Sequence, residues 1–387
     1  MCRMRRFIAL LLCSVALPAV GQSPISAAPD LLDFNQPATL GLNLAPGTET
    51  ARVFTAGDNR YQYSRGAVPV AFNGKLFVQW QAAPDAEQTV RSQVHYAMSV
   101  DGRQWSDAIV LAKSSPGVNV SAGGWWVFGD TLVAYINIWP QSETPENGTV
   151  EYRTSRDGIR WTAAQPVLDS SGEPLAGAIE PGIGALRDGR LLTALHQPPG
   201  LVAKPYFTDD ATGRTGWQAG EMLNAPSRDN LSRELEPSWF SRGNEQVMVF
   251  RDRDSSYRIL AAVSDDRGET WSLPTLSNIP DSRAKANAGN LTADSAYIVN
   301  NPSGNRARFP LVVFTSADGY TFDRAWLLRR GAHSIPAPND LRRKLYPAYS
   351  APKTEVFEGY LYVTYTTENA NIDITRVPLN AIESGAE

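Results

Sequence analysis

The feature that most constrains this chain is a turn motif that returns at nearly regular intervals. Residues 99–105, 155–161, 264–271 and 316–322 each begin with Ser, continue through Asp and Gly, and end on an aromatic residue. In such a turn the Ser and Asp side chains bond backbone amides, and Gly takes the positive φ that other residues avoid. Each segment follows an apolar run typical of a strand. The motif therefore predicts one hairpin design used repeatedly, with a structural rather than a catalytic role.

The spacing of the closing aromatic residues indicates the size of the repeated unit. Between Trp161 and Trp271 lies a gap of about two periods, and Trp217, after a related Gly-containing turn, divides it. Successive spacings from Trp105 to Phe322 are then 56, 56, 54 and 51 residues. Periods near fifty residues with several strands per unit are typical of propeller blades.

The two ends of the chain are predicted to share one blade. One period before Trp105 lies Phe54, at the end of the strand-like residues 51–54. Residues 360–365 and 372–377 are strand-like but no turn motif follows them, so their sheet lacks an outer strand. A strand at residues 51–54 would supply it and close the ring, which removes exposed sheet edges. We therefore predict an all-β, six-bladed β-propeller with a shared N- and C-terminal blade. Seven blades would need a larger contribution from the residues before Phe54.

The N-terminal residues are typical of a secretion signal. Three arginines among the first six residues precede an apolar run at residues 7–20, which is too short to span a bilayer. We therefore assign residues 1–21 to a signal peptide, 22–50 to an N-terminal extension and 51–387 to the propeller domain. We expect a secreted or periplasmic protein without a membrane anchor.

The composition narrows the classes of partner and cofactor. The chain is 42% hydrophobic and 20% charged with a net charge of -4, and it has no basic stripe, so we expect no nucleic-acid partner. Both cysteines, Cys2 and Cys13, lie in the predicted signal peptide, which leaves the mature chain without disulfides. No paired-histidine or EF-hand pattern occurs. We predict a monomer without cofactor or metal, and leave calcium in the central channel open.

Propeller geometry selects the face of the disc that carries the site. The repeated turns join the third and fourth strands at one face, so the starts of innermost strands and the ends of second strands lie at the other. Residues at those positions are rich in arginine, carboxylates and amides, which suits the binding of a charged sugar. We predict substrate contacts from this rim: Arg65, Gln79, Gln81, Glu180, Arg283, Lys285, Asn287, Asn301 and Tyr346.

Four rim residues are candidates for the chemistry itself: Arg251, His196, His95 and Glu236. Arg251 can bind a carboxylate through two parallel hydrogen bonds, and a structural salt bridge is the alternative. His196 and His95 could transfer protons near neutral pH, although a strand-end histidine more often caps a neighbouring backbone. Glu236 and Glu180 each precede Pro at an inner-strand start, where they could flank a glycosidic bond or bond backbone amides.

The repeated turns resemble the aspartate boxes of sialidases, from about residue 54 to residue 377. The resemblance implies the propeller fold more strongly than any chemistry. Exo-sialidases combine an Arg-Ile-Pro element before the first box with an arginine triad, an aspartate acid and a Tyr-Glu nucleophile pair. Here the corresponding residues 63–69 read Tyr-Ser-Arg-Gly-Ala-Val-Pro, which departs from that element and counts against a sialidase.

A closer similarity is to sialidase-like propellers that release terminal rhamnose linked to glucuronate, some by β-elimination and some by hydrolysis. Five stretches carry it: Glu-Pro-Ser-Trp at 236–239, Phe-Arg-Asp at 250–252, and residues 279–290, 360–365 and 374–378. In such enzymes a rim histidine is catalytic, and some relatives have Gln there, a position that Gln79 or Gln81 would occupy. The resemblance thus implies a terminal-sugar lyase or hydrolase acting on acidic oligosaccharides or polysaccharides. The alternatives are an exo-α-sialidase and a glycan-binding propeller without turnover.

Overall fold

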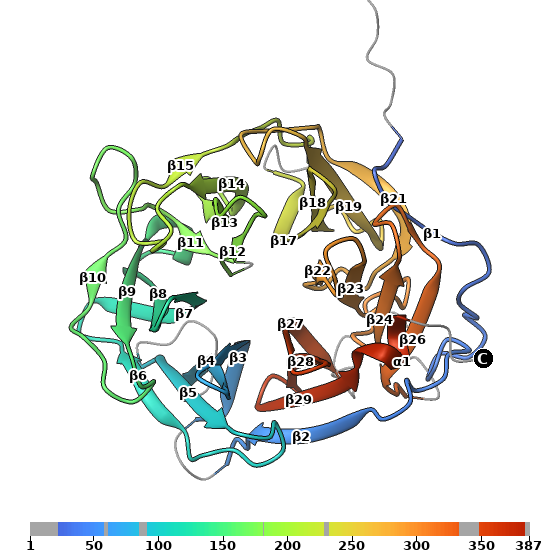
Figure 1. The fold of residues 1–387 in the computed structure, drawn as a ribbon, viewed down its shortest axis with the longest axis horizontal. Helices are drawn as coiled ribbons and strands as arrows, with labels where there is room; N and C mark the ends of the chain where they lie inside the picture. The colour runs from blue at the N-terminus through green and yellow to red at the C-terminus, as the bar shows by residue number, and fades with distance from the viewer. Residues whose placement is uncertain are drawn as a thin grey trace, which may run out of the picture.

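Six small antiparallel sheets stand in a ring around a central axis, as Figure 1 shows. The computed structural model describes residues 22–57, 61–84, 91–180, 182–227, 232–332 and 348–383. These residues are almost entirely strands and turns, with one short α-helix. The predicted all-β, six-bladed propeller is therefore confirmed.

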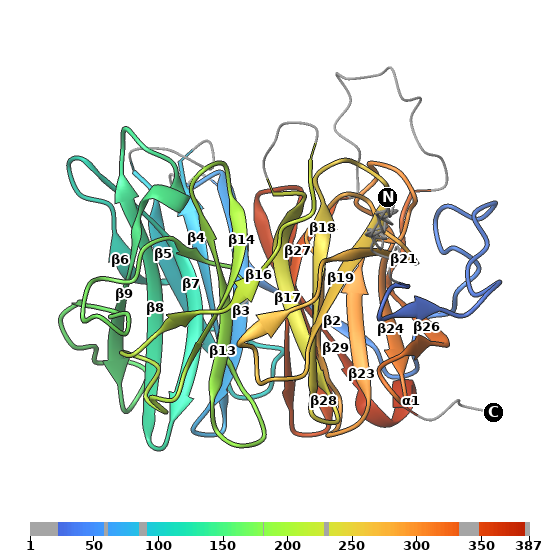
Figure 2. The same ribbon diagram turned by 90° about the horizontal axis from the view of Figure 1, so that it is seen from above.

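Each blade is built from the axis outwards, and its strands run between the two faces of the disc (Figure 2). Blade 1 contains β3 (Tyr63–Phe72), β4 (Lys75–Ala83), β5 (Gln93–Ser99) and β6 (Ile109–Lys113). Blade 2 contains β7 (Val118–Phe128), β8 (Thr131–Pro140), β9 (Thr149–Ser155) and β10 (Gln165–Pro166). Blade 3 contains β11 (Ala178–Ile179), β12 (Gly184–Ala185), β13 (Leu191–Gln197), β14 (Val202–Thr208) and β15 (Gln218–Ala219).

The second half of the ring repeats the same order of strands. Blade 4 contains β17 (Glu234–Arg242), β18 (Glu245–Asp252), β19 (Arg258–Ser264) and β21 (Thr275–Pro280). Blade 5 contains β22 (Asn287–Asn290), β23 (Ala296–Asn300), β24 (Leu311–Ser316) and β26 (Arg324–Arg329). Blade 6 contains β27 (Tyr349–Phe357), β28 (Tyr360–Thr367), β29 (Asn371–Pro378) and β2 (Glu49–Phe54). The remaining elements are β1 (Ser26–Ala27), β16 (Glu221–Met222), β20 (Thr270–Trp271), β25 (Thr321–Phe322), the 3-10 helix η1 (Pro145–Asn147) and α1 (Leu379–Glu383).

The ring closes where the N-terminal strand β2 pairs with the C-terminal strand β29 (Figure 1). Ala51 lies opposite Ile374, and Phe54 lies opposite Ile372. The closure predicted from the missing outer strand is thus confirmed. The predicted signal peptide, residues 1–21, lies outside the described residues. No helix in the described ranges is long and apolar enough to cross a membrane.

The repeated turns have the hydrogen bonds that their sequence predicts. In blade 2 the Gly158 amide donates to Ser155 Oγ at 2.8 Å, and the Ile159 amide donates to Asp157 Oδ1 at 2.9 Å. Gly158 has a φ of 72°, and a Cβ placed there would lie 2.4 Å from the Phe77 ring of blade 1. The turn therefore needs glycine both for its conformation and for its close approach to the preceding blade.

The turn before Trp217 is a fifth version of the same design. Thr208 takes the place of Ser, and its Oγ1 accepts a hydrogen bond from the Asp210 amide at 3.0 Å. Asp210 Oδ1 accepts from the Thr212 amide at 3.0 Å, and Gly213 has a φ of 66°. This turn explains why the period continues through blade 3 although the sequence there departs from the Ser-Asp-Gly pattern.

The core consists of six apolar clusters within the described residues, one between each pair of neighbouring blades. Between blades 1 and 2, for example, the rings of Phe77 and Trp125 meet edge to face at 6.3 Å. The N-terminal extension also packs: Ile25 is buried between blades 4 and 5, and β1 pairs with β25. Burial of apolar area between blades therefore stabilises the ring, and the described residues contain no cysteine that could add a disulfide.

Candidate functional site

A cavity of about 480 Å³ opens at the centre of the ring. Its lining includes the ends of second strands, such as Asn137 in β8 and Arg251 in β18, and the starts of inner strands, such as Arg65 in β3. These strand ends lie away from the repeated turns. Every blade except the fifth contributes a strand residue, and Lys285 enters from the connection that precedes blade 5.

Glu236 forms the centre of the charged cluster in this cavity. It lies at a β-bulge in β17 with a φ of 52°, a strained conformation for a residue with a side chain. Its Oε2 accepts a hydrogen bond from Arg251 Nη1 at 3.0 Å, and its Oε1 lies 3.6 Å from Arg65 Nη2. Burial opposes its ionisation, but Arg251, Lys285 and Arg65 outweigh burial and hold the pKa of Glu236 well below its usual range. Glu236 is therefore a carboxylate at neutral pH.

His196 supports the backbone of Glu236. Its Nε2 accepts a hydrogen bond from the Glu236 amide at 3.0 Å, so the ring proton sits on Nδ1, which lies 3.6 Å from Glu180 Oε1. Burial lowers the pKa of His196, and the nearby Glu180 offsets this only in part. The imidazole is thus neutral, and its basic nitrogen is occupied by a backbone amide. This is the capping arrangement that the sequence left open as the alternative to proton transfer.

Glu180 joins three elements across the cavity. Lys285 Nζ donates to Glu180 Oε2, and Lys353 Nζ donates to the Glu180 main-chain oxygen at 2.6 Å. Burial opposes the ionisation of Glu180, but the positive charge of Lys285 outweighs it, so the pKa of Glu180 is lowered. Like Glu236, it is a carboxylate that is already matched by cations.

Basic side chains outnumber carboxylates in the lining. The carboxylates are Glu146, Glu180 and Glu236, and the basic side chains are Arg65, Arg251, Arg253, Arg283, Lys285 and Lys353. Gln81 also lines the cavity, and its Nε2 lies 3.4 Å from the Val120 oxygen. Of the residues that sequence analysis proposed, the structure thus brings eight into this cavity: Arg65, Gln81, Glu180, His196, Glu236, Arg251, Arg283 and Lys285.

Four proposed site residues lie outside the lining, which corrects their expected placement. His95 is buried in the third strand of blade 1, where it packs edge-on against Phe54, Tyr61 and Trp80. Its Nε2 bonds Gln93 Oε1 at 3.0 Å, and burial lowers the pKa of His95 to about 4. A third-strand position is one strand too far from the axis to reach the cavity.

The other three are amides that bond neighbouring strands instead of facing the cavity. Gln79 Nε2 donates to the Gly124 oxygen, and Asn301 Nδ2 donates to the Pro310 oxygen at 3.1 Å. Asn287 Nδ2 donates to Ser238 Oγ at 3.0 Å. Buried amides need such partners, and here the backbone and a hydroxyl supply them. Tyr346 lies outside the described residues.

Sequence reasoning missed two basic residues in the lining, Arg253 and Lys353. Arg253 follows Arg251 by two residues and so emerges at the same strand end, a signal that could have identified it. Lys353 gives no such signal, because it enters the cavity through a register shift in β27 between Ser350 and Lys353. Within the described residues, no cluster of three or more His, Asp or Glu side chains could hold a metal ion.

Comparison with known proteins places the chain in a family. Residues 74–367 match the BNR repeat-like domain. The chain belongs to the BNR repeat-like domain family. A search of curated proteins found no match for its sequence.

Solved structures similar to this BNR repeat-like protein share its fold at low sequence identity. The Hadza microbial sialidase Hz136 has a TM-score of 0.67 at 16% identity, over 86% of this chain and 69% of that one. A Trypanosoma rangeli sialidase mutant displaying trans-sialidase activity has a TM-score of 0.65 at 13% identity, over 89% of this chain and 60% of that one. A protein of unknown function from Dyadobacter fermentans has a TM-score of 0.64 at 14% identity, over 86% of this chain and 99% of that one. The chain therefore has a sialidase-like propeller fold, and it spans less than two thirds of the length of the Trypanosoma rangeli enzyme.

Proposed function

We propose that this protein removes a terminal sugar from an acidic, uronate-bearing glycan, with rhamnosyl-glucuronate as its substrate unit. The observation that carries the proposal is the excess of basic side chains in the central cavity, six against three carboxylates among the described residues. Surplus cations offer charge-assisted hydrogen bonds to a uronate carboxylate. The cavity volume also falls within the range of about 300 to 1,000 Å³ that is typical of small-ligand sites.

Arg251 and Arg283 are the groups proposed to bind the substrate carboxylate. In each, the Nε is buried and has no hydrogen-bond partner among the described residues. A buried donor without a partner costs about 1 to 3 kcal/mol, and a ligand carboxylate would satisfy it. Arg251 also has one Nη bonded to Glu236, which fixes the plane of the guanidinium.

An exo-α-sialidase is the second candidate, and one observation favours it. Arg65 and Arg251 contact Glu236, and a third arginine, Arg308, interacts electrostatically with all three residues. Sialic acid also carries a carboxylate, and the similar structures from Hadza microbes and Trypanosoma rangeli are named as sialidases. A third candidate is a glycan-binding propeller that uses the same cations without turnover.

The test is a substrate panel with a matched control. The purified protein is incubated with a rhamnosyl-glucuronate oligosaccharide, gum arabic and sialyllactose, while released rhamnose, released sialic acid and the absorbance of an unsaturated uronate are measured. We expect rhamnose release from the first two, and none from rhamnosyl-glucose, which lacks the carboxylate. Release of sialic acid alone would establish the second candidate. Binding of the oligosaccharide without release would establish the third.

A further inference from the structure

A buried lysine spans the central channel. Lys353 belongs to β27, the inner strand of blade 6, and its side chain reaches the Glu180 main-chain oxygen in blade 3, on the opposite side of the ring (Figure 1). Its relative exposure is 3%, yet it contributes to the lining of the cavity. A register shift in β27 and a positive φ at Ala351 turn the strand at this point. The local backbone is therefore shaped around this side chain.

Lys353 differs from the other cavity lysine in its partners. Lys285 forms an ion pair with the Glu180 carboxylate. Lys353 Nζ donates to a main-chain oxygen at 2.6 Å, and no salt bridge joins it to a carboxylate among the described residues. A carbonyl accepts a hydrogen bond from either an ammonium or a neutral amine, so this contact does not force the charged form.

The surroundings of Lys353 favour the neutral amine. Burial is the largest cause, followed by the like charge of Lys285, and together they lower the pKa of Lys353 to about 7. Glu180 and Glu236 act in the opposite direction and only partly offset them. A lysine that is neutral near pH 7 can accept a proton.

The other titratable groups that face Lys353 are less suited to this role. Glu180 and Glu236 are matched by cations that lower their pKa values. Each is thus a weak base, and neither supplies the protonated carboxylic acid that two-carboxylate hydrolysis requires. The Nε2 of His196 is occupied by the Glu236 amide.

We propose that Lys353 is the base that removes the proton α to the uronate carboxylate, so that the terminal sugar leaves by β-elimination. This inference rests on the proposed function. The neutral amine takes the proton from C5, the electron pair forms the C4–C5 double bond, and the bond from C4 to the glycosidic oxygen breaks. That oxygen leaves with the terminal sugar and receives the proton from the ammonium form of Lys353. The products are the free sugar and an unsaturated uronate, and no co-reactant is needed. The guanidinium of Arg251 neutralises the carboxylate and so makes the C5 proton removable.

The kinetic test compares Lys353→Met with Lys113→Met, an exposed lysine on β6. We expect Lys353→Met to lose about 10² to 10⁴-fold in kcat on rhamnosyl-glucuronate, as for loss of a general base. Substrate affinity should change little. In the wild type, kcat/KM should rise as the pH passes about 7 and then level off, because the base must be unprotonated. Added small primary amines should restore part of the turnover to Lys353→Ala. Lys113→Met should keep the wild-type rate and pH profile.

A second measurement does not depend on turnover or on the folding of a variant. Competitive labelling of wild-type amines over a pH series, read residue by residue by mass spectrometry, reports the pKa of each lysine. We expect Lys353 to titrate near 7, and the acidic oligosaccharide should protect it.

Turnover by Lys353→Met with an unchanged pH profile, or titration of Lys353 in the range of an exposed lysine, would overturn its role as base while leaving the proposed function intact. A wild type that turns over none of the acidic glycans would overturn both the proposed function and the catalytic step assigned to Lys353. Release of rhamnose without an unsaturated uronate would overturn elimination alone.

Discussion

At the scale of single residues, the site is defined by which charges already have partners. Glu236 and Glu180 are held by cations from blade 1, blade 4 and the blade 5 connection, whereas Arg251 and Arg283 keep buried Nε donors without a partner among the described residues. The carboxylates thus position the cations, and the cations are left to bind an anion. This division makes the arginines the natural targets for substitution.

Replacing Arg251 by Lys keeps the positive charge but removes the planar guanidinium, which can form two parallel hydrogen bonds with a carboxylate. Each hydrogen bond between charged groups is worth about 1.5 to 3 kcal/mol, so kcat/KM on the acidic substrate should fall by about 10 to 100-fold. The melting temperature should stay within about 2 °C of the wild type, because Lys can still neutralise Glu236. Exposed Arg156→Lys, on the turn face in blade 2, is the matched control. Unchanged kinetics on the acidic substrate would remove Arg251 from carboxylate recognition.

Glu355 in β27 gives a prediction about stability and pH. Burial raises its pKa to about 7 from a usual value of about 4.5, although its carboxylate accepts a hydrogen bond from the Ala71 amide at 3.1 Å. The folded state therefore retains a proton that the unfolded state loses, and stability falls as the pH rises from about 4.5 to 7. Glu355→Gln keeps the acceptor and cannot ionise. At pH 8 the free energy of unfolding of Glu355→Gln should exceed that of the wild type by about 1 kcal/mol, because the side chain is only partly shielded from solvent. At pH 4 the two proteins should have the same free energy of unfolding.

Glu358→Gln, an exposed change in the following turn, is the control for Glu355→Gln and should show no pH-dependent difference. Denaturant unfolding at pH 4 and pH 8 measures both variants. Equal destabilisation of Glu355→Gln at the two pH values would show that the carboxyl group is ionised without cost in the fold.

Predictions for single residues succeeded where the location of the side chain follows from its position along a strand. Arg251 and Glu236 reach the cavity because a second strand ends and an inner strand begins there. Gln79 failed because it lies four residues before the end of β4, where the Gly124 backbone of blade 2 covers it. Lys353 could not be predicted, because a bulge changes which face its strand presents. Such register shifts depend on contacts between blades, which a single sequence does not display.

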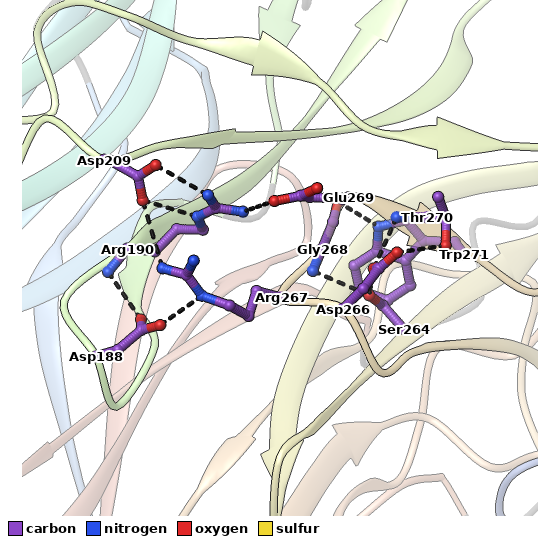
Figure 3. Close-up of polar contacts among 10 residues, drawn as sticks. All are labelled: Asp188, Arg190, Asp209, Ser264, Asp266, Arg267, Gly268, Glu269, Thr270 and Trp271. Carbon is purple, nitrogen blue, oxygen red and sulfur yellow. Dashed lines mark hydrogen bonds and ion pairs between the residues drawn. The ribbon is translucent and has the colours of Figure 1, made fainter.

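At the scale of elements, the repeated turn joins its own hairpin to the preceding blade. Figure 3 shows the turn of blade 4, in which the Asp266 carboxylate accepts from the Thr270 amide at 2.8 Å and from the Thr270 hydroxyl. Beside it, Glu269 accepts from Arg190 of blade 3 at 2.7 Å, and Arg190 also forms two hydrogen bonds with Asp209. The turn is therefore anchored to a neighbouring blade as well as to itself.

Replacing Asp266 by Ala should cost stability and spare activity. The change removes the acceptor of the turn's amide and hydroxyl groups, and losses of this kind amount to about 1 to 3 kcal/mol. The cavity is at the other face of the disc, so kcat/KM should stay within about twofold of the wild type in this folded variant. Thermal unfolding and the substrate assay measure the two effects. Asp265→Ala, one residue earlier and exposed, should change neither quantity. Lost turnover at a normal melting temperature would assign this turn a role in the site.

At the scale of the whole molecule, the sequence predicted the ring from a period and from one missing strand. The period identified the blades because each turn requires the same few residue types, including Thr208 in place of Ser. It did not predict how residues 22–50 pack, since β1 pairs with the turn strand β25 through a short parallel ladder that has no periodic pattern. The pairing of β2 with β29 joins the two ends of the chain in one blade and closes the ring, and its contribution to stability can be tested directly.

A disulfide across the closing blade should stabilise the whole propeller. The hydroxyls of Thr50 in β2 and Thr375 in β29 lie 2.8 Å apart, so their side chains already face each other in the register. The mature chain predicted to begin at residue 22 has no other cysteine, so Thr50→Cys with Thr375→Cys can form one intramolecular bond. The bond would close a loop of more than three hundred residues and restrict the unfolded chain, a gain of about 2 to 4 kcal/mol. Denaturant unfolding of the double variant with and without reductant measures it, and the single variants, which lack the bond, should be insensitive to reductant. Equal unfolding midpoints for the oxidised and reduced double variant would mean that the ring opens elsewhere before β2 and β29 separate.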